Sequence, residues 1–490
     1  MRNKGNITAI TFLLAVFTQA NKSHAQGYFF ERVYDESLAQ VSYVIGDLNT
    51  GDAIVIDPRR DIDVYLKIAE TNHLKITKIA ETHIHADFLS GSRELAAATN
   101  AELLLSDEGG PDWQYQFPHL GLRDGSLITI GMVELKVMHT PGHTPESITF
   151  LVRDTEISTA PQRAITGDFI LVGDVGRPDL LEKSAGHVGS QEIAAKQLYA
   201  SIQQFSKLPD DLEIWGGHGA GSFCGKNLST IPHSTLKEEK QFNKAFQFKN
   251  DESEFVTYIL DGQPAPPKYF AVMKQLNRVE RPLLIQIPIH PMLDQPAFQK
   301  SIDNNLLIID TRSKEEVAEG HVSGSLHIEN GKSWSTWIGS LVGYEQQIVL
   351  VTDEGQTEEL TRKLMRIGMD NIYGFVTDLE KMNIELEKSD LVNIEELKKH
   401  LDNKDVQIID VRTEGEYNAG HIKGVENIVL TTLEENVDRI RKDKPIIVHC
   451  QSGVRAAMAY SILKRNGIQN VRVYQGGINE WTETEYQLVQ

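Results

Sequence analysis

Histidine and aspartate residues recur along the first half of this 490-residue sequence in a pattern that could bind one metal ion. His83, His85 and Asp87 occupy alternate positions directly after the apolar run at residues 76–80. Three further candidates follow in order, each in a glycine-containing turn, and they are His143, Asp168 and His218. Imidazoles and carboxylates at strand ends can converge on one cation, so this order predicts a metal site.

A second reactive group lies near the end of the chain, around Cys450. The apolar run at 445–449 predicts a buried strand and the pattern at 456–464 predicts a helix, which places Cys450 in the loop between them. The amides of such a loop form an anion site that stabilises a thiolate or a charged persulfide. Arg455 adds a cation to this loop. The loop residues expected to bind the substrate are Gln451, Ser452, Gly453 and Val454.

The other cysteine, Cys224, lies shortly after His218. Two interpretations remain open, namely a small buried hydrophobic side chain and a thiol near the metal pocket that carries or senses persulfide sulfur. Because the sequence has only two cysteines, far apart, it excludes a disulfide framework, a CxxC redox pair and a four-thiolate zinc site.

The elements that position these residues are predicted to form three domains. Two similar stretches, 310–322 and 410–422, each follow an apolar run and precede a strand, a loop and a helical segment, which is typical of parallel α/β domains. In the first copy Thr352 and Thr357 occupy the places of Cys450 and Arg455, so that copy is expected to be inactive. A leader segment is predicted at 1–25 and the first domain, with a C-terminal linker, at 26–285. The two repeated domains are predicted at 286–385 and 390–490.

Composition and charge narrow the class of protein. With 40% hydrophobic and 24% charged residues, the chain has the composition of a globular protein. A net charge of −20 without a long basic run argues against nucleic acid or an anionic membrane as a partner. Residues 1–25 have the basic start, apolar centre and small-residue end of a signal peptide, which predicts export to the periplasm. A cytoplasmic location is the alternative.

The histidine and aspartate motifs resemble those of the metallo-β-lactamase superfamily, and within it the glyoxalase II and persulfide dioxygenase branch. Dinuclear hydrolases of this superfamily have a further histidine directly after the Asp of the first motif, and this chain has Phe88 there. A phenyl ring cannot bind a second metal, so a mononuclear centre is expected.

The resemblance to persulfide dioxygenases implies one Fe(II) per chain, held by His83, His143 and Asp168 in an open triad. Arg177 is expected to clamp a carboxylate of the thiol persulfide, with a loop salt bridge as the alternative. The remaining pocket candidates are His85, Asp87, His218 and Cys224, and direct ligation by His85 stays open.

The Cys450 loop, with Asp410, Arg412 and His421 before it and Trp481 after it, resembles a rhodanese domain. The implied fold is α/β throughout, a metallo-β-lactamase αββα sandwich followed by two rhodanese-like parallel α/β domains. This order is similar to that of bacterial persulfide dioxygenase-sulfurtransferases of sulfide detoxification.

The family resemblance implies that a low-molecular-weight thiol persulfide is oxidised with O2 to sulfite, and that Cys450 transfers sulfur onto sulfite to give thiosulfate. The chain is also expected to form a homo-oligomer. Two alternatives remain, a mononuclear zinc thioester hydrolase of glyoxalase II type fused to a sulfurtransferase, and a non-catalytic persulfide sensor or sulfur carrier.

Overall fold

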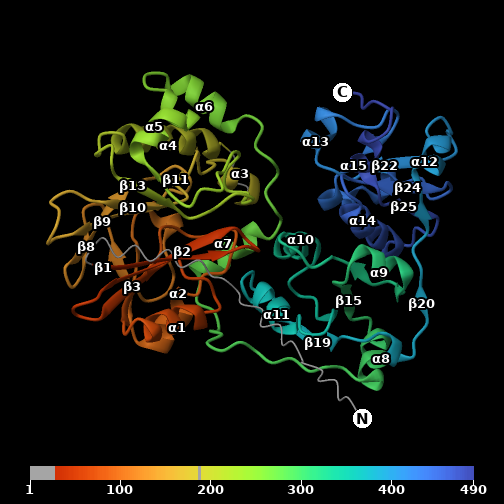
Figure 1. Ribbon diagram of the computed structural model, residues 1–490, viewed down its shortest axis with the longest axis horizontal. Helices are drawn as coiled ribbons and strands as arrows, with labels where there is room; N and C mark the ends of the chain where they lie inside the picture. Colours follow the sequence, from red (N-terminus) through yellow and green to blue (C-terminus); the bar gives the residue numbers. More distant parts are fainter. Residues whose placement is uncertain (1–27, 186–188) are drawn as a thin grey trace, which may run out of the picture.

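The computed structural model describes residues 28–185 and 189–490, so the predicted signal peptide lies outside the described residues. Within these ranges no helix combines the length and apolar character needed to cross a membrane. The described chain forms a β-sandwich domain and two smaller α/β domains (Figure 1).

The first domain consists of two six-stranded sheets that face each other, with helices on both outer sides (Figure 1). Alternate residues of the facing strands, such as Tyr43, Ile45 and Phe150, share one apolar core because side chains of a strand alternate between its two faces. The first sheet has the order β1 (Tyr28–Asp35), β2 (Gln40–Asp47), β3 (Asp52–Ile56), β4 (Lys75–Ala80), β5 (Glu102–Ser106), β6 (Leu120–Leu122). The second has the order β14 (Ser234–Thr235), β13 (Glu213–Gly216), β10 (Arg163–Gly167), β9 (Ile148–Asp154), β8 (Val133–His139), β7 (Leu127–Ile130).

Helices and a short hairpin complete this domain. The hairpin pairs β11 (Ile170–Leu171) with β12 (Asp174–Val175). The helices are α1 (Asp63–Thr71), α2 (Ser92–Thr99), α3 (Leu180–Ala185), α4 (Ser190–Phe205), α5 (Leu236–Phe242), α6 (Glu252–Leu260) and α7 (Phe270–Arg278).

The middle domain has a four-stranded parallel sheet in the order β17 (Leu326–His327), β15 (Leu307–Asp310), β18 (Ile348–Val351), β19 (Ile372–Val376). A two-stranded sheet pairs β16 (His321–Val322) with β20 (Leu386–Glu387). Its helices are α8 (Gln295–Asp303), α9 (Lys314–Glu319), α10 (Trp334–Leu341) and α11 (Thr357–Met365).

The last domain repeats this plan with a five-stranded parallel sheet, in which Val448 lies opposite Ile409 on one side and Val473 on the other. The order is β21 (Leu391–Val392), β25 (Val471–Tyr474), β24 (Ile446–His449), β22 (Gln407–Asp410), β23 (Glu426–Asn427). Its helices are α12 (Ile394–His400), α13 (Glu414–Ala419), α14 (Val454–Arg465) and α15 (Gly477–Thr482). The sandwich followed by two parallel α/β domains confirms the fold class expected from the sequence.

Helix α7 joins the sandwich to the middle domain. Tyr269 and Phe270 belong to one apolar cluster with Phe88 of the first domain and Leu364 of α11. Gly339 lies where α10 meets α7, and a Cβ there would come within 2.7 Å of the Tyr269 ring. A glycine at this position therefore allows the two helices to approach closely.

Candidate functional site

The candidate metal centre lies where loops after β4, β8, β10 and β13 converge. These loops supply His83, His143, Asp168 and His218, and each of the four residues is at most 6% exposed. The Asp168 Oδ2 atom lies 3.9 Å from His83 Nε2, 3.6 Å from His143 Nε2 and 3.4 Å from His218 Nε2. One carboxylate oxygen thus faces three imidazole nitrogens inside the protein.

Several of the converging atoms have no hydrogen-bond partner in the part of the chain that the structure describes. They are His83 Nε2 and both carboxylate oxygens of Asp168, and all three are buried. Polar atoms in this state cost free energy unless something binds them. The candidate ligand atoms of His83, His143 and Asp168 all lie within 4.8 Å of one another. Two imidazoles and one carboxylate fit a cation here, and this donor set suits non-haem Fe(II).

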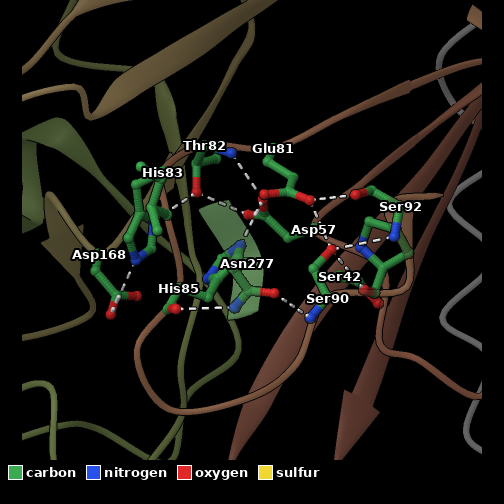
Figure 2. Close-up of polar contacts among 12 residues, drawn as sticks. Ser42, Asp57, Glu81, Thr82, His83, His85, Ser90, Ser92, Asp168 and Asn277 are labelled. Carbon is green, nitrogen blue, oxygen red and sulfur yellow. Dashed lines mark hydrogen bonds and ion pairs between the residues drawn. The ribbon is translucent and has the colours of Figure 1, made fainter. Parts of the chain in front are cut away.

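Hydrogen bonds direct both histidines of the triad toward the centre, and Figure 2 shows those behind His83. The Thr82 hydroxyl donates to Asp57 at 2.8 Å, so it accepts from His83 Nδ1 at 2.9 Å. His143 Nδ1 donates to the Arg177 carbonyl at 3.1 Å. Both rings therefore present Nε2 to the metal position, as the outer contacts of metal-binding histidines ordinarily do.

Burial keeps these imidazoles neutral. It lowers the pKa of His83 well below its ordinary value, and it lowers the pKa of His143 to about 4. Neutral imidazole is the form that binds metals.

His85 points elsewhere. Its Nε2 atom lies 3.1 Å from Asp57, and its ring packs against Phe88 with centroids 4.4 Å apart. Although burial lowers its pKa, the carboxylates of Asp57, Glu81 and Asp87 outweigh burial and raise the pKa to about 9. His85 is thus outside the group of three converging ligands. Phe88, at 1% exposure, fills the neighbouring space and belongs to the apolar cluster shared with α7.

Asp87, His218 and Cys224 form an adjoining group whose polar atoms also lie within 4.8 Å of one another. Asp87 Oδ2 is 3.3 Å from His218 Nε2. Cys224 is 1% exposed, and burial together with the charges of Asp168 and Asp87 raises the pKa of its thiol well above the ordinary value. The structure therefore places the buried Cys224 thiol beside the metal position.

The structure corrects the expectation for Arg177. Its side chain has no exposed surface, and Nε and Nη2 each bind Asp179 at 2.7 Å. Nη2 also donates to the Pro264 carbonyl at 2.6 Å. With its donors turned to protein groups, the guanidinium makes the buried salt bridge that was the alternative. The carbonyl of Arg177 instead orients His143.

Two residues that sequence reasoning missed hold the metal-binding loop in place. Asp57 directly follows β3 in a left-handed conformation with φ of 55° and accepts from the backbone and hydroxyl of Thr82. Asn277 of α7 donates to the carbonyls of His85 and Phe88 at 2.9 and 2.8 Å and accepts from Ser90 N (Figure 2). The strand-end position of Asp57 was a visible signal. Nothing in the sequence links Asn277 to a loop almost 190 residues earlier.

Replacement of Asp57 by asparagine is expected to weaken metal binding by roughly 10- to 100-fold, because the carboxylate accepts from Thr82 and His85 behind the ligands. The affinity is measured by anaerobic titration with Fe(II) or with Co(II) as a spectroscopic probe. The control is Asp52→Asn at the other end of β3, which should bind metal normally. Unchanged affinity in a folded Asp57→Asn protein would contradict this positioning role.

The Cys450 loop connects β24 to α14. Cys450 is 1% exposed, and its Sγ accepts from Gly453 N at 3.2 Å. Gly453 has φ of 89°, and a Cβ there would lie 2.2 Å from the Gln475 carbonyl, so the turn requires glycine. Val454 begins α14, so the Gly453 amide contacts the sulfur at the N-terminus of this helix.

Side chains around this loop are already engaged. Both terminal nitrogens of Arg455 bind Glu416 at 2.7 Å, a partner that the sequence did not predict. Burial raises the pKa of Glu416, but the bonds from Arg455 and Thr413 outweigh it and lower the pKa to about 2. The Gln451 amide donates to Asn479 at 2.6 Å. The charge of Arg455 is therefore balanced by Glu416, and the Gly453 amide is the group that donates to Sγ.

The middle domain touches this loop and lacks its chemistry. Lys314 Nζ donates to the Ser452 carbonyl at 2.7 Å. The equivalent loop of the middle domain runs from Thr352 to Thr357, between β18 and α11, and contains neither cysteine nor arginine.

Comparisons with known proteins agree with this division. The metallo-beta-lactamase superfamily model matches residues 37–218, and the rhodanese-like domain model matches residues 294–381 and 393–484. A solved structure described as a metallo-beta-lactamase from Staphylococcus aureus subsp. aureus COL is 42% identical with a TM-score of 0.67, covering 72% of this chain and 100% of that chain.

Two curated relatives match the first domain. Human mitochondrial persulfide dioxygenase ETHE1 is 29% identical over 209 residues, which are 41% of this chain and 69% of that protein. Hydroxyacylglutathione hydrolase from Francisella tularensis subsp. novicida is 29% identical over 185 residues, 38% of this chain and 64% of that protein.

Proposed function

Since this chain belongs to the metallo-beta-lactamase superfamily and carries two rhodanese-like domains behind that fold, we propose that it is a persulfide dioxygenase coupled to a sulfurtransferase. The first domain oxidises a low-molecular-weight thiol persulfide, and the last domain forms thiosulfate. The overall oxidation is RSSH + O2 + H2O → RSH + SO3²⁻ + 2H⁺. One observation carries the proposal, namely the open triad of His83, His143 and Asp168 with Phe88 where a second metal would need a histidine.

The triad would hold one Fe(II), which when bound supplies the redox chemistry that activates O2 and the substrate sulfur. The chain itself contributes position and exclusion of water. Asp57 orients His83 through the Thr82 hydroxyl, which contacts His83 Nδ1. The Arg177 carbonyl orients His143 by accepting from its Nδ1. Phe88 and the apolar cluster behind it close the space beside His85. Asp87, His218 and Cys224 line the adjoining side, where the substrate sulfur would lie.

Sulfur transfer would occur at Cys450 in two balanced steps. The thiolate attacks the outer sulfur of RSSH, which forms a Cys450 persulfide and releases RSH with the proton. Sulfite then attacks the outer sulfur of this persulfide, which releases thiosulfate and restores the thiolate. The amide of Gly453 and the start of α14 stabilise the negative sulfur in both states.

The experiment compares Fe(II)-loaded and Zn(II)-loaded protein on glutathione persulfide and on the thioester S-D-lactoylglutathione. The proposal predicts O2-dependent sulfite from the persulfide with the iron form alone, and negligible thioester cleavage with either metal. Rapid thioester hydrolysis by the zinc form, with no sulfite from the iron form, would favour the glyoxalase II type hydrolase.

A further inference from the structure

A cavity of about 260 Å³ lies between the first domain and the middle domain, beside the metal position. Asp87 lines it on the metal side. Both carboxylate oxygens of Asp87 are buried and have no hydrogen-bond partner among the described residues, and Oδ2 lies 3.3 Å from His218 Nε2. Phe223 and Phe270 supply apolar walls. The opposite wall comes from the start of α10 in the middle domain, and its residues are Lys332, Ser333 and Thr336.

Ion pairs between the domains fix this wall. Arg366 binds Asp61 through Nε and Nη2 at 2.8 and 2.6 Å, and Arg60 binds Asp370 through both terminal nitrogens at 2.7 and 2.8 Å. The Asp61 side chain is fully buried, and its loss of hydration is offset by Arg59 of its own domain together with Arg362 and Arg366 of the middle domain. The close contact of α10 with α7 at Gly339 adds a second attachment. The middle domain is thus held rigidly against the cavity.

Two exposed charged side chains at this cavity have no hydrogen bond or ion pair with the residues that the structure describes. Lys332 is exposed and makes no hydrogen bond or ion pair with any described residue. Glu36, on the first-domain side, is likewise exposed and unpaired among the described residues. A free ammonium and a free carboxylate on one cavity match a ligand that carries both charges, such as an amino-acid or peptide thiol. Arg177, the cation expected for this task, is buried and already paired.

We propose that the catalytically silent rhodanese-like domain forms one wall of the persulfide pocket, and that Lys332 binds a carboxylate of a zwitterionic thiol persulfide there. This inference rests on the proposed dioxygenase function of the same site. Glu36 faces the amino group of the ligand, and the thiol persulfide end reaches past Asp87 to the metal position. The middle domain has lost the sulfur-transfer cysteine and acts as a substrate-binding element.

The test measures O2 consumption by Fe(II)-loaded full-length protein with glutathione persulfide and with the uncharged persulfide of 2-mercaptoethanol. Lys332→Ala is expected to raise KM for glutathione persulfide by about tenfold with kcat within about twofold, and Lys332→Glu to raise it further. Lys332→Arg should retain a KM within about threefold of the wild type. KM for the uncharged persulfide should stay unchanged in all three variants.

The matched control is Lys300→Glu, a charge reversal at an exposed, unpaired lysine on α8 of the same domain, which should leave both KM values unchanged. The assignment would be overturned if Lys332→Ala had the wild-type KM for both persulfides. It would also be overturned if the substitution raised KM for both persulfides by the same factor. If the wild type consumes no O2, the dioxygenase function fails. Calorimetric binding of S-methylglutathione then still tests the pocket, since binding should weaken about tenfold in Lys332→Ala, and unchanged binding would refute it.

Discussion

Replacement of Cys450 by serine is expected to reduce thiosulfate formation at least about 1,000-fold and to leave O2 consumption unchanged. A serine hydroxyl in the same loop cannot form a persulfide, so the transfer has no alternative route through this domain. The loop should keep its shape, because Ile478 N and Asn479 N donate to the backbone carbonyls of Cys450 and Gln451, and these bonds do not involve the thiol.

The measurement is the rate of thiosulfate formation from sulfite and glutathione persulfide, with the slow uncatalysed reaction subtracted. The control is Thr352→Ser, which changes the equivalent position of the middle domain. O2 consumption and thiosulfate formation are both expected at wild-type levels in this variant. Substantial enzymatic thiosulfate formation by Cys450→Ser would locate the transfer elsewhere, with Cys224 as the only other cysteine to examine.

Replacement of Asp168 by asparagine should abolish O2 consumption and spare sulfur transfer, the reverse of the effect expected for Cys450→Ser. Loss of the only carboxylate in the triad is expected to remove bound iron and to lower O2 consumption about 1,000-fold or more, while sulfur transfer by Cys450 stays intact. The metal-free variant should fold, because asparagine has nearly the size of aspartate and the Asp168 carboxylate oxygens have no hydrogen-bond partner among the described residues.

Iron content, O2 uptake and thermal unfolding are measured on the same preparations of wild type and variant. Together they distinguish loss of a metal ligand from a metal site elsewhere and from general misfolding. Added metal should raise the unfolding temperature of the wild type, since it binds only the folded state, and should not change that of the variant. Full O2 consumption by Asp168→Asn would show that the metal lies elsewhere. Loss of both activities would indicate general misfolding instead of ligand loss.

Sequence motifs predicted the parts of the site that depend on local order. His83, His143 and Asp168 each follow an apolar strand, and strand ends of one sandwich edge meet in space, so their convergence could be predicted. The repeated stretch near Asp310 and Asp410 likewise predicted two parallel domains of the same plan.

Contacts between distant segments could not be predicted from spacing. Arg455 meets Glu416 across 39 residues, and Asn277 reaches the loop after β4 only because α7 folds back over it. The pairing of Arg177 with Asp179 is local, yet the sequence does not reveal whether a loop arginine is buried with its neighbour or open to a ligand. Lys332, which lines the cavity, belongs to the middle domain, and the missing cysteine there predicted only that this domain is inactive in sulfur transfer.

The middle domain touches both reactive regions. Lys332 lines the cavity beside the metal position, and Lys314 donates to the Ser452 carbonyl in the Cys450 loop. The proposed site of sulfite formation and the proposed site of sulfite use therefore lie on either side of the middle domain. Because both sites belong to one chain, the effective concentration of sulfite at Cys450 is raised.

The most direct test of the account is the stoichiometry of O2 uptake by Fe(II)-loaded Cys450→Ser protein given glutathione persulfide. Without sulfur transfer, the account predicts one O2 consumed and one sulfite released for each persulfide, with one glutathione formed. No O2 uptake by protein with a full complement of iron, or persulfide loss without sulfite, would contradict the assignment of the first domain as a persulfide dioxygenase.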